Sequence, residues 1–231
     1  MIKDKMKKIA SFALAMVTLV SCQFVSFNGK AGNLFNAKGP VVVKTMEGLT
    51  DFDAITVNGS ADVEFVQGSS FLVEVTTNED VFEKLDFKVE NGVLVLQPKE
   101  KVKLNRSKVN VKVVAPVLTE VNVNGAADFD MDSYEGENRL KIQVNGAGDL
   151  KLDDVIIPEL KVVVNGAGDI NFKDIDIEEV SVTVNGAGDA VMSGKAGNVD
   201  VTISGAGDVD LSGLAYQKLN THKNGIGRIK R

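Results

Sequence analysis

A glycine-centred hexapeptide recurs along the C-terminal half of this chain at nearly constant spacing, as in Asn165-Gly-Ala-Gly-Asp-Ile170. Clear copies begin at positions 124, 145, 165, 185 and 204, and a degenerate copy begins at 224. Successive copies start 21, 20, 20, 19 and 20 residues apart, and an isolated early copy occupies residues 58–63. A fixed period of this length indicates an architecture of stacked repeats.

Apolar residues alternate with polar ones on both sides of each copy. Leu160, Val162 and Val164 precede one copy, and Ile170 and Phe172 follow it. Alternation with period two predicts strands with one buried face. An antiparallel meander would gain nothing from an identical corner every 20 residues, whereas a coil places residue i over residue i+20.

We therefore predict an all-β fold, a single-stranded parallel β-helix or solenoid with about 20 residues per rung. The usual hand of parallel crossovers favours right-handed winding. Val144, Val164 and Val184 should then occupy neighbouring parallel strands.

The corner residues suit such a stack. The first glycine of each copy permits positive φ and a close approach of the next rung, as at Gly166. The following alanine is small enough to point inward at the bend, and Asn145, Asn165 and Asn185 could form a ladder of side-chain amides.

Four aspartates occupy equivalent corner positions: Asp149, Asp169, Asp189 and Asp208. Stacked carboxylates about 5 Å apart repel by roughly 0.8 kcal/mol per pair in water. One interpretation is structural: each carboxylate accepts hydrogen bonds from the amides of its own corner and faces solvent. The other is a cation, most plausibly Ca²⁺, bound between rungs. Arg228 replaces aspartate in the final copy and could neutralise the end of the column. Apart from this Ca²⁺ alternative, the sequence predicts no metal or other cofactor.

Residues 41–120 do not keep the 20-residue step, and they predict a β-rich N-terminal cap continuous with the regular rungs of residues 121–231. Asn78 to Leu85 predicts one short helix with Asn78 as its N-cap. Asn91-Gly92 predicts a tight hairpin turn. The basic stretch from Lys99 to Lys108 predicts a solvated edge or, as the alternative, a contact with a polyanion.

The N-terminus predicts export. Four lysines precede the uncharged apolar run of residues 9–20, which is short for a membrane span and typical of a secretory signal. The run ends in Leu19-Val20-Ser21-Cys22, which resembles a bacterial lipobox. We predict a lipoprotein signal peptide over residues 1–21, lipidation at Cys22, and a flexible tether over residues 22–40.

Composition excludes several classes of function. With one cysteine and one histidine, the chain can form neither an internal disulfide nor a multi-histidine metal site. The formal net charge is −6, and removal of the predicted signal peptide leaves it near −9, which disfavours nucleic acid as a partner. The absence of tryptophan removes the ring best suited to stacking on sugars.

The repeated corners, the early copy at residues 58–63 and the Asn91-Gly92-Val-Leu-Val-Leu hairpin resemble the "putative auto-transporter adhesin, head GIN domain" family (DUF2807-like), over about residues 45–230. This family is common in lipoproteins of Bacteroidetes. The resemblance implies a β-helical fold and an adhesin, and it brings no catalytic residues.

We therefore expect a non-catalytic protein of the cell envelope, lipid-anchored in the outer membrane and facing either the periplasm or the outside. Its expected role is adhesion, or another binding or structural role, with an unknown glycan or protein as ligand. The alternative is a polysaccharide lyase or hydrolase that uses adjacent carboxylates such as Asp169 and Asp189. A homo-oligomer is a further expectation, because an open solenoid edge invites pairing.

Overall fold

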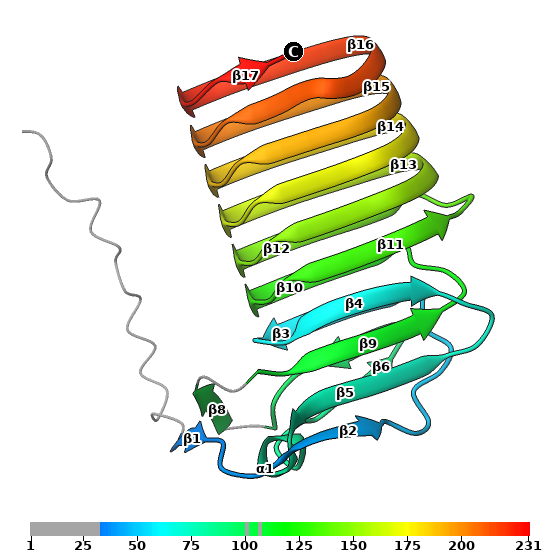
Figure 1. Ribbon diagram of the computed structural model, residues 1–231, viewed down its shortest axis with the longest axis vertical. Helices are drawn as coiled ribbons and strands as arrows, with labels where there is room; N and C mark the ends of the chain where they lie inside the picture. The colour runs from blue at the N-terminus through cyan, green and yellow to red at the C-terminus, as the bar shows by residue number, and fades with distance from the viewer. Residues whose placement is uncertain (1–32, 100–101, 106–107) are drawn as a thin grey trace, which may run out of the picture. The chain divides into compact units, whose positions relative to one another are not determined.

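The computed structural model describes residues 33–99, 102–105 and 108–231 (Figure 1). The predicted signal peptide and the lipidation site Cys22 lie outside the described residues, as do residues 100, 101, 106 and 107 of the basic stretch. Among the described residues, no helix is long and apolar enough to cross a bilayer.

The C-terminal half is a stack of parallel strands, each paired with the strand one repeat later (Figure 1). Val144 pairs with Val164, and Val164 pairs with Val184, as the repeat predicts. The predicted all-β solenoid is therefore confirmed. The strands of this part are β12 (Leu140–Ala147), β13 (Leu150–Ala167), β14 (Ile170–Ala187), β15 (Ala190–Ala206), β16 (Val209–Ile226) and β17 (Ile229–Lys230).

The isolated early copy of the hexapeptide belongs to the same stack. Strands β3 (Ala54–Gly59) and β4 (Asp62–Gln67) lie directly against β10 (Glu120–Ala126) and β11 (Phe129–Glu135), in parallel register. Asn58 pairs with Asn124, although 66 residues separate them in the chain. A long insertion therefore leaves the stack after its first rung and returns in register.

The insertion and the strand before it build the N-terminal base of the stack. Strand β2 pairs antiparallel with β5, and β5 pairs antiparallel with β9. Strands β6 and β7 form the predicted hairpin, with Asn91 and Gly92 at φ 53° and 79°. The elements of this part are β2 (Val41–Thr45), β5 (Leu72–Asn78), α1 (Glu79–Phe82), β6 (Lys88–Glu90), β7 (Val93–Leu96), β8 (Val102–Asn105) and β9 (Asn110–Ala115).

The helix is shorter than predicted, and Asn78 does not cap it through its side chain. Its amide instead donates to the carbonyl oxygen of Gly39 at 2.7 Å. The carboxylate of Asp80 accepts a hydrogen bond from the backbone N–H of Lys38 at 2.8 Å, and this bond lowers the pKa of Asp80.

Part of the range assigned to a tether is therefore attached to the folded domain. Strand β1 (Asn33–Asn36) also lies in that range and pairs in parallel with β8. The folded part of the chain thus begins before residue 41.

Inward side chains form apolar columns along the axis of the stack. Ile142, Val162 and Val182 form one fully buried column, and Leu152 and Phe172 belong to another. Tyr134 is also buried, and its hydroxyl accepts from the N–H of Leu118 and donates to the carbonyl oxygen of that residue. The rungs therefore enclose a mostly aliphatic core.

The corner glycines are required because the rungs approach each other there. At Gly166, with φ +147°, an added Cβ would lie 1.9 Å from the carbonyl oxygen of Gly146 in the rung below. No neighbouring side chain can move to relieve that clash, because the contact is with backbone. Each rung therefore depends on the glycine of the next one.

Gly166→Ala should destabilise the domain severely, by more than the roughly 1 kcal/mol that alanine costs at positive φ alone. Gly48→Ala is the matched control, because Gly48 has φ +77° and nothing within 4 Å of an added Cβ. Urea unfolding followed by circular dichroism measures both losses. Equal losses in the two variants would contradict the close-approach explanation.

Candidate binding surface along the corner

The corner asparagines form the predicted amide ladder. Asn124 donates to Asn58, Asn145 to Asn124, Asn165 to Asn145 and Asn185 to Asn165, each through Nδ2 to Oδ1 at 2.9–3.1 Å. Each amide donates toward the rung below, so the ladder has a single direction along the axis.

The corner aspartates form a second ladder, but with different acceptor bonds from those predicted. Each Oδ1 accepts the backbone N–H of the next rung's corner residue, not one of its own corner, as from Asp169 N–H to Asp149 at 2.9 Å. The reason is the parallel stacking, which places the next rung's amide directly over the carboxylate. The ladder contains Asp62, Asp128, Asp149, Asp169, Asp189 and Asp208, with bonds of 2.7–3.2 Å.

Arg228 ends this ladder. Its backbone N–H donates to Asp208 at 2.7 Å. Among the described residues, its guanidinium forms no ion pair with Asp208, so the predicted neutralisation by the side chain is not observed.

The corner alanines point outward, which corrects the prediction. Ala147, Ala167 and Ala187 are exposed, because the extended backbone on either side alternates and the buried positions fall at Val144 and Leu150. A line of methyl groups therefore separates the asparagine ladder from the aspartate ladder.

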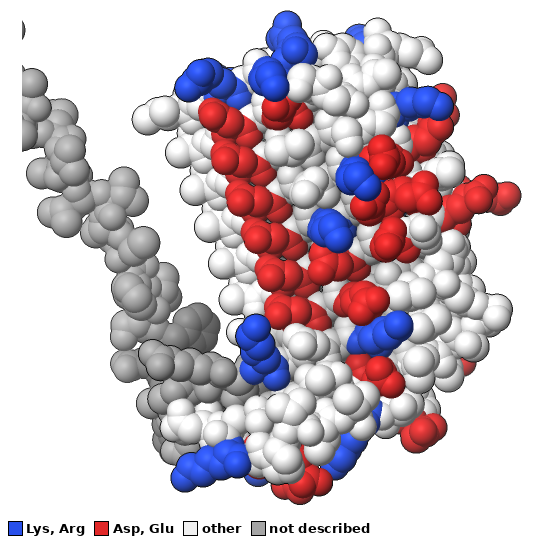
Figure 2. All heavy atoms as spheres, viewed as in Figure 1, with Lys and Arg blue, Asp and Glu red and all other residues white. Residues whose placement is uncertain are grey.

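The aspartates border a shallow groove that runs along the corner, and Figure 2 shows them as a continuous acidic stripe. The groove has a volume of about 620 Å³. Glycine backbone and alanine methyl groups line it beside Asp62, Asp128, Asp149 and Asp169. Such a surface offers carboxylate acceptors over several consecutive rungs.

A further carboxylate, Asp130, lies beside the lower end of the stripe. Partial desolvation raises its pKa, and repulsion from Asp128, Glu64 and Asp62 adds to that effect. The ammonium group of Lys151 opposes it. Asp62, Glu64, Asp128 and Asp130 therefore form a cluster of carboxylates on the first two rungs.

The cation interpretation finds no preformed site. Within the described ranges, no group of three or more His, Cys, Asp or Glu side chains is arranged to hold a metal ion. Each corner carboxylate also commits one oxygen to an amide of the next rung, which leaves the other oxygen facing solvent.

The rungs have a second corner, which the sequence did not reveal and which lies across the rung from the glycine corner. Ser133, Asp154 and Asp174 form a column with φ of 55°, 52° and 51°, and in the next rung Gly194, with φ 116°, pairs with Ile175 after a shift of register. Here aspartate rather than glycine adopts the left-handed conformation, which its short polar side chain tolerates.

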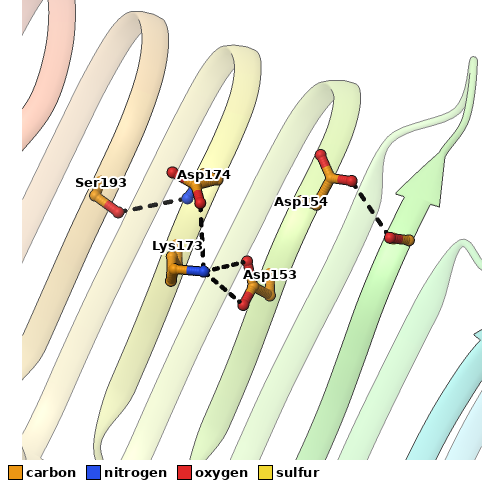
Figure 3. A network of polar contacts seen from close by, with 6 residues as sticks. Asp153, Asp154, Lys173, Asp174 and Ser193 are labelled. Atoms are coloured by element: carbon orange, nitrogen blue, oxygen red, sulfur yellow. Dashed lines mark hydrogen bonds and ion pairs between the residues drawn. The ribbon is translucent and has the colours of Figure 1, made fainter.

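Polar contacts join the rungs at this second corner (Figure 3). Lys173 Nζ lies 3.2 Å from the carboxylate of Asp153 one rung below and 3.4 Å from that of Asp174. These bonds raise the pKa of Lys173. The only sequence signal was an aspartate and a lysine 20 residues apart.

A more enclosed pocket than the corner groove lies at the start of the stack, next to Asn58 and Ala61. Its volume is about 330 Å³, and Leu85, Phe87 and Leu96 supply much of its apolar lining. This is at the lower limit of small-molecule pockets and too small for a length of polysaccharide.

Taken together, the geometry defines a parallel β-solenoid with laddered polar faces, a class of protein that presents one repeated surface. The sequence model of the "putative auto-transporter adhesin, head GIN domain" family matches residues 51–230, and the chain belongs to that family. No curated protein sequence matches the chain.

Two solved structures share the fold. A "putative adhesin" from Bacteroides fragilis NCTC 9343 is 15% identical, with a TM-score of 0.62 over 85% of this chain and 99% of that one. A "putative lipid binding protein" from Parabacteroides distasonis ATCC 8503 is 17% identical, with a TM-score of 0.51 over 86% of this chain and 100% of that one.

Asp210 gives a pH-dependent prediction at the C-terminal end. Hydrogen bonds from Ser212 and then from Lys230 lower the pKa of its carboxyl to about 2. A depressed folded-state pKa stabilises the fold above the ordinary value of 3.8, and this stabilisation disappears as the pH falls through about 2.

Asp210→Asn should therefore lower the melting temperature at neutral pH, and the gap from the wild type should close between about pH 4 and pH 2. Asp200→Asn is the control, because the Asp200 side chain is exposed and forms no hydrogen bond or ion pair with the described residues. Melting followed by circular dichroism across this range measures the gap. A gap that stays constant would refute the assignment.

Proposed function

We propose that this chain is an envelope-anchored adhesin without catalytic activity, which binds a glycan or protein through the polar outer surface of its solenoid. The observation that carries the proposal is the repeated corner surface, where identical carboxylates border one groove over consecutive rungs. A ligand with its own repeat can contact several equivalent sites on such a surface at once. Membership of the adhesin family supports the same conclusion.

The enzyme alternative is less well supported by the corner geometry. A glycosidase needs two carboxyl groups in different environments, one kept protonated as the acid. Asp169 and Asp189 instead make the same bond to the next rung's amide, at 2.8 and 2.7 Å. Their equivalence fits a structural and binding role better than an acid–base pair.

Anchoring through Cys22 is the second part of the proposal. The basic n-region, the short apolar run and the residues Leu19-Val20-Ser21-Cys22 support it. Acyl chains on Cys22 would hold the protein at a membrane, with roughly 0.8 kcal/mol for each buried methylene group. We place the protein in the outer membrane, facing either the periplasm or the outside.

Replacing Asp149, Asp169 and Asp189 together by asparagine should reduce binding of the full-length chain to intact cells or to a broad glycan array. Asparagine keeps the Oδ1 acceptor for the next amide and removes the charge, so the fold should survive. The matched control is the triple variant Glu159→Gln, Glu178→Gln and Asp200→Asn, whose exposed carboxylates lie away from the corner.

We expect the corner variant to lose at least about tenfold in affinity while the control stays within about twofold. Equal binding by both variants would show that the corner does not bind the ligand. Melting with and without EDTA on the same proteins tests the cation interpretation, because a Ca²⁺ ladder predicts an EDTA effect in the wild type alone.

Cys22→Ser should release the protein from the membrane fraction of the native host. Fractionation followed by immunoblotting measures this, and metabolic labelling with a radioactive fatty acid should mark the wild type only. Ser21→Ala is the control, since it keeps a small residue before the cysteine. A Cys22→Ser protein that stays in the membrane fraction would refute anchoring at this position.

A further inference from the structure

The last rung differs in charge from the rest of the solenoid. Residues 209–231 contain a single carboxylate side chain, Asp210, and five basic residues: Lys218, Lys223, Arg228, Lys230 and Arg231. Residues 32–208 have the opposite balance, with 30 acidic and 16 basic residues. The five basic residues lie at the C-terminal end of the stack, which Figure 2 shows at the top, and we call them the basic tip.

Most of this positive charge is unpaired. All five side chains are exposed. Lys230 pairs with Asp210 at 2.9 Å, whereas Lys223 donates to the carbonyl oxygen of Gly227 and Arg231 donates to the hydroxyl of Thr221. Among the described residues, Lys218 and Arg228 have no acidic partner. The tip therefore carries a positive potential on an otherwise negative body.

The tip is open, but it is not built to accept another strand. The outer edge of β16 is paired only with β17, at Val209 and Asp210, within the described part of the chain. Thr221 and Lys223 stack above Val201 and Ile203, so polar residues follow buried apolar ones in these columns. Lysines and inward charges of this kind block strand addition at sheet edges.

The basic tip lies at the end of the stack opposite the base. The strand order places β16 and β17 at one end of the stack and β2, β6 and β7 at the other. Phe35 of β1 packs against the core beneath Lys84 of the base, so the chain enters there. If the chain is anchored at Cys22, as proposed above, the basic tip is the end of the stack opposite the end at which the anchored segment enters.

We propose that the basic tip binds an acidic polysaccharide through its carboxylate, sulfate or phosphate groups. This inference rests on the proposed adhesin function and adds a second binding site to it, separate from the acidic corner. The tips of two copies carry charge of the same sign, which opposes tip-to-tip pairing. A long polyanion contacts several cations together and releases their counterions, so binding weakens steeply as salt increases.

The test measures binding of the full-length chain to chondroitin sulfate and to polygalacturonate by biolayer interferometry, with neutral dextran as the reference. The tip variant is Lys218→Gln, Lys223→Gln and Arg228→Gln. The control variant is Lys151→Gln, Lys161→Gln and Lys195→Gln, which removes the same charge from exposed lysines of the solenoid side. Melting curves verify that both variants fold, and Lys218→Glu alone serves if the triple tip variant does not.

We expect the wild type to bind both polyanions and not dextran, with affinity falling at least about tenfold between 50 and 200 mM salt. The tip variant should lose at least about tenfold at low salt, and the control should stay within about twofold. The proposal is overturned if the wild type ignores both polyanions, or if the two triple variants lose affinity equally.

Two further outcomes separate this inference from the proposed function. Polyanion binding that the tip variant retains in full would overturn the tip, while cell or glycan-array binding that depends on the corner aspartates would leave the adhesin function standing. Polyanion binding that depends on the tip, without any cell adhesion, would support the tip and overturn the adhesin function. Light scattering at low salt adds a last outcome: self-association lost in the tip variant would identify a second copy as the partner and overturn the polysaccharide.

Discussion

The backbone contact between successive corners is the constraint on which the rest of the structure depends. An added Cβ on Gly166 would lie 1.9 Å from the carbonyl oxygen of Gly146, so one rung fits over another only where the upper residue lacks a side chain. That contact fixes the register, and the register in turn aligns the asparagine and aspartate ladders. The apolar columns inside and the carboxylate stripe outside are two consequences of one packing requirement.

Features that follow from the period could be predicted from the sequence. Val144, Val164 and Val184 stack as the 20-residue step requires, and the amides of Asn145 and Asn165 bond as expected. Local features of the corner were harder to predict from the sequence. The outward direction of Ala167 depends on where the alternation restarts after the corner, and the acceptor role of the aspartates depends on the amide of another rung.

Two features had almost no sequence signal. The second corner uses Asp154 and Asp174 in the left-handed conformation, where no glycine marks a turn. The pairing of Asn58 with Asn124 crosses 66 residues, so the period alone could not place the early copy within the stack. Likewise, the charge of the last rung is visible in the sequence, but its place at an open end required the strand order.

The direction of the ladders has a mechanical consequence. The bonds between rungs run along the axis of the stack, so a load applied to the last rung, with the base held, would pull on them in series. Such a load opens a few bonds at a time and peels the outermost rung first. Each peeled rung of about 20 residues lengthens the chain by roughly 65 Å. The protein would thus lengthen under tension, one rung at a time, while the lower rungs stay folded. This stepwise unfolding would limit the force that reaches the base.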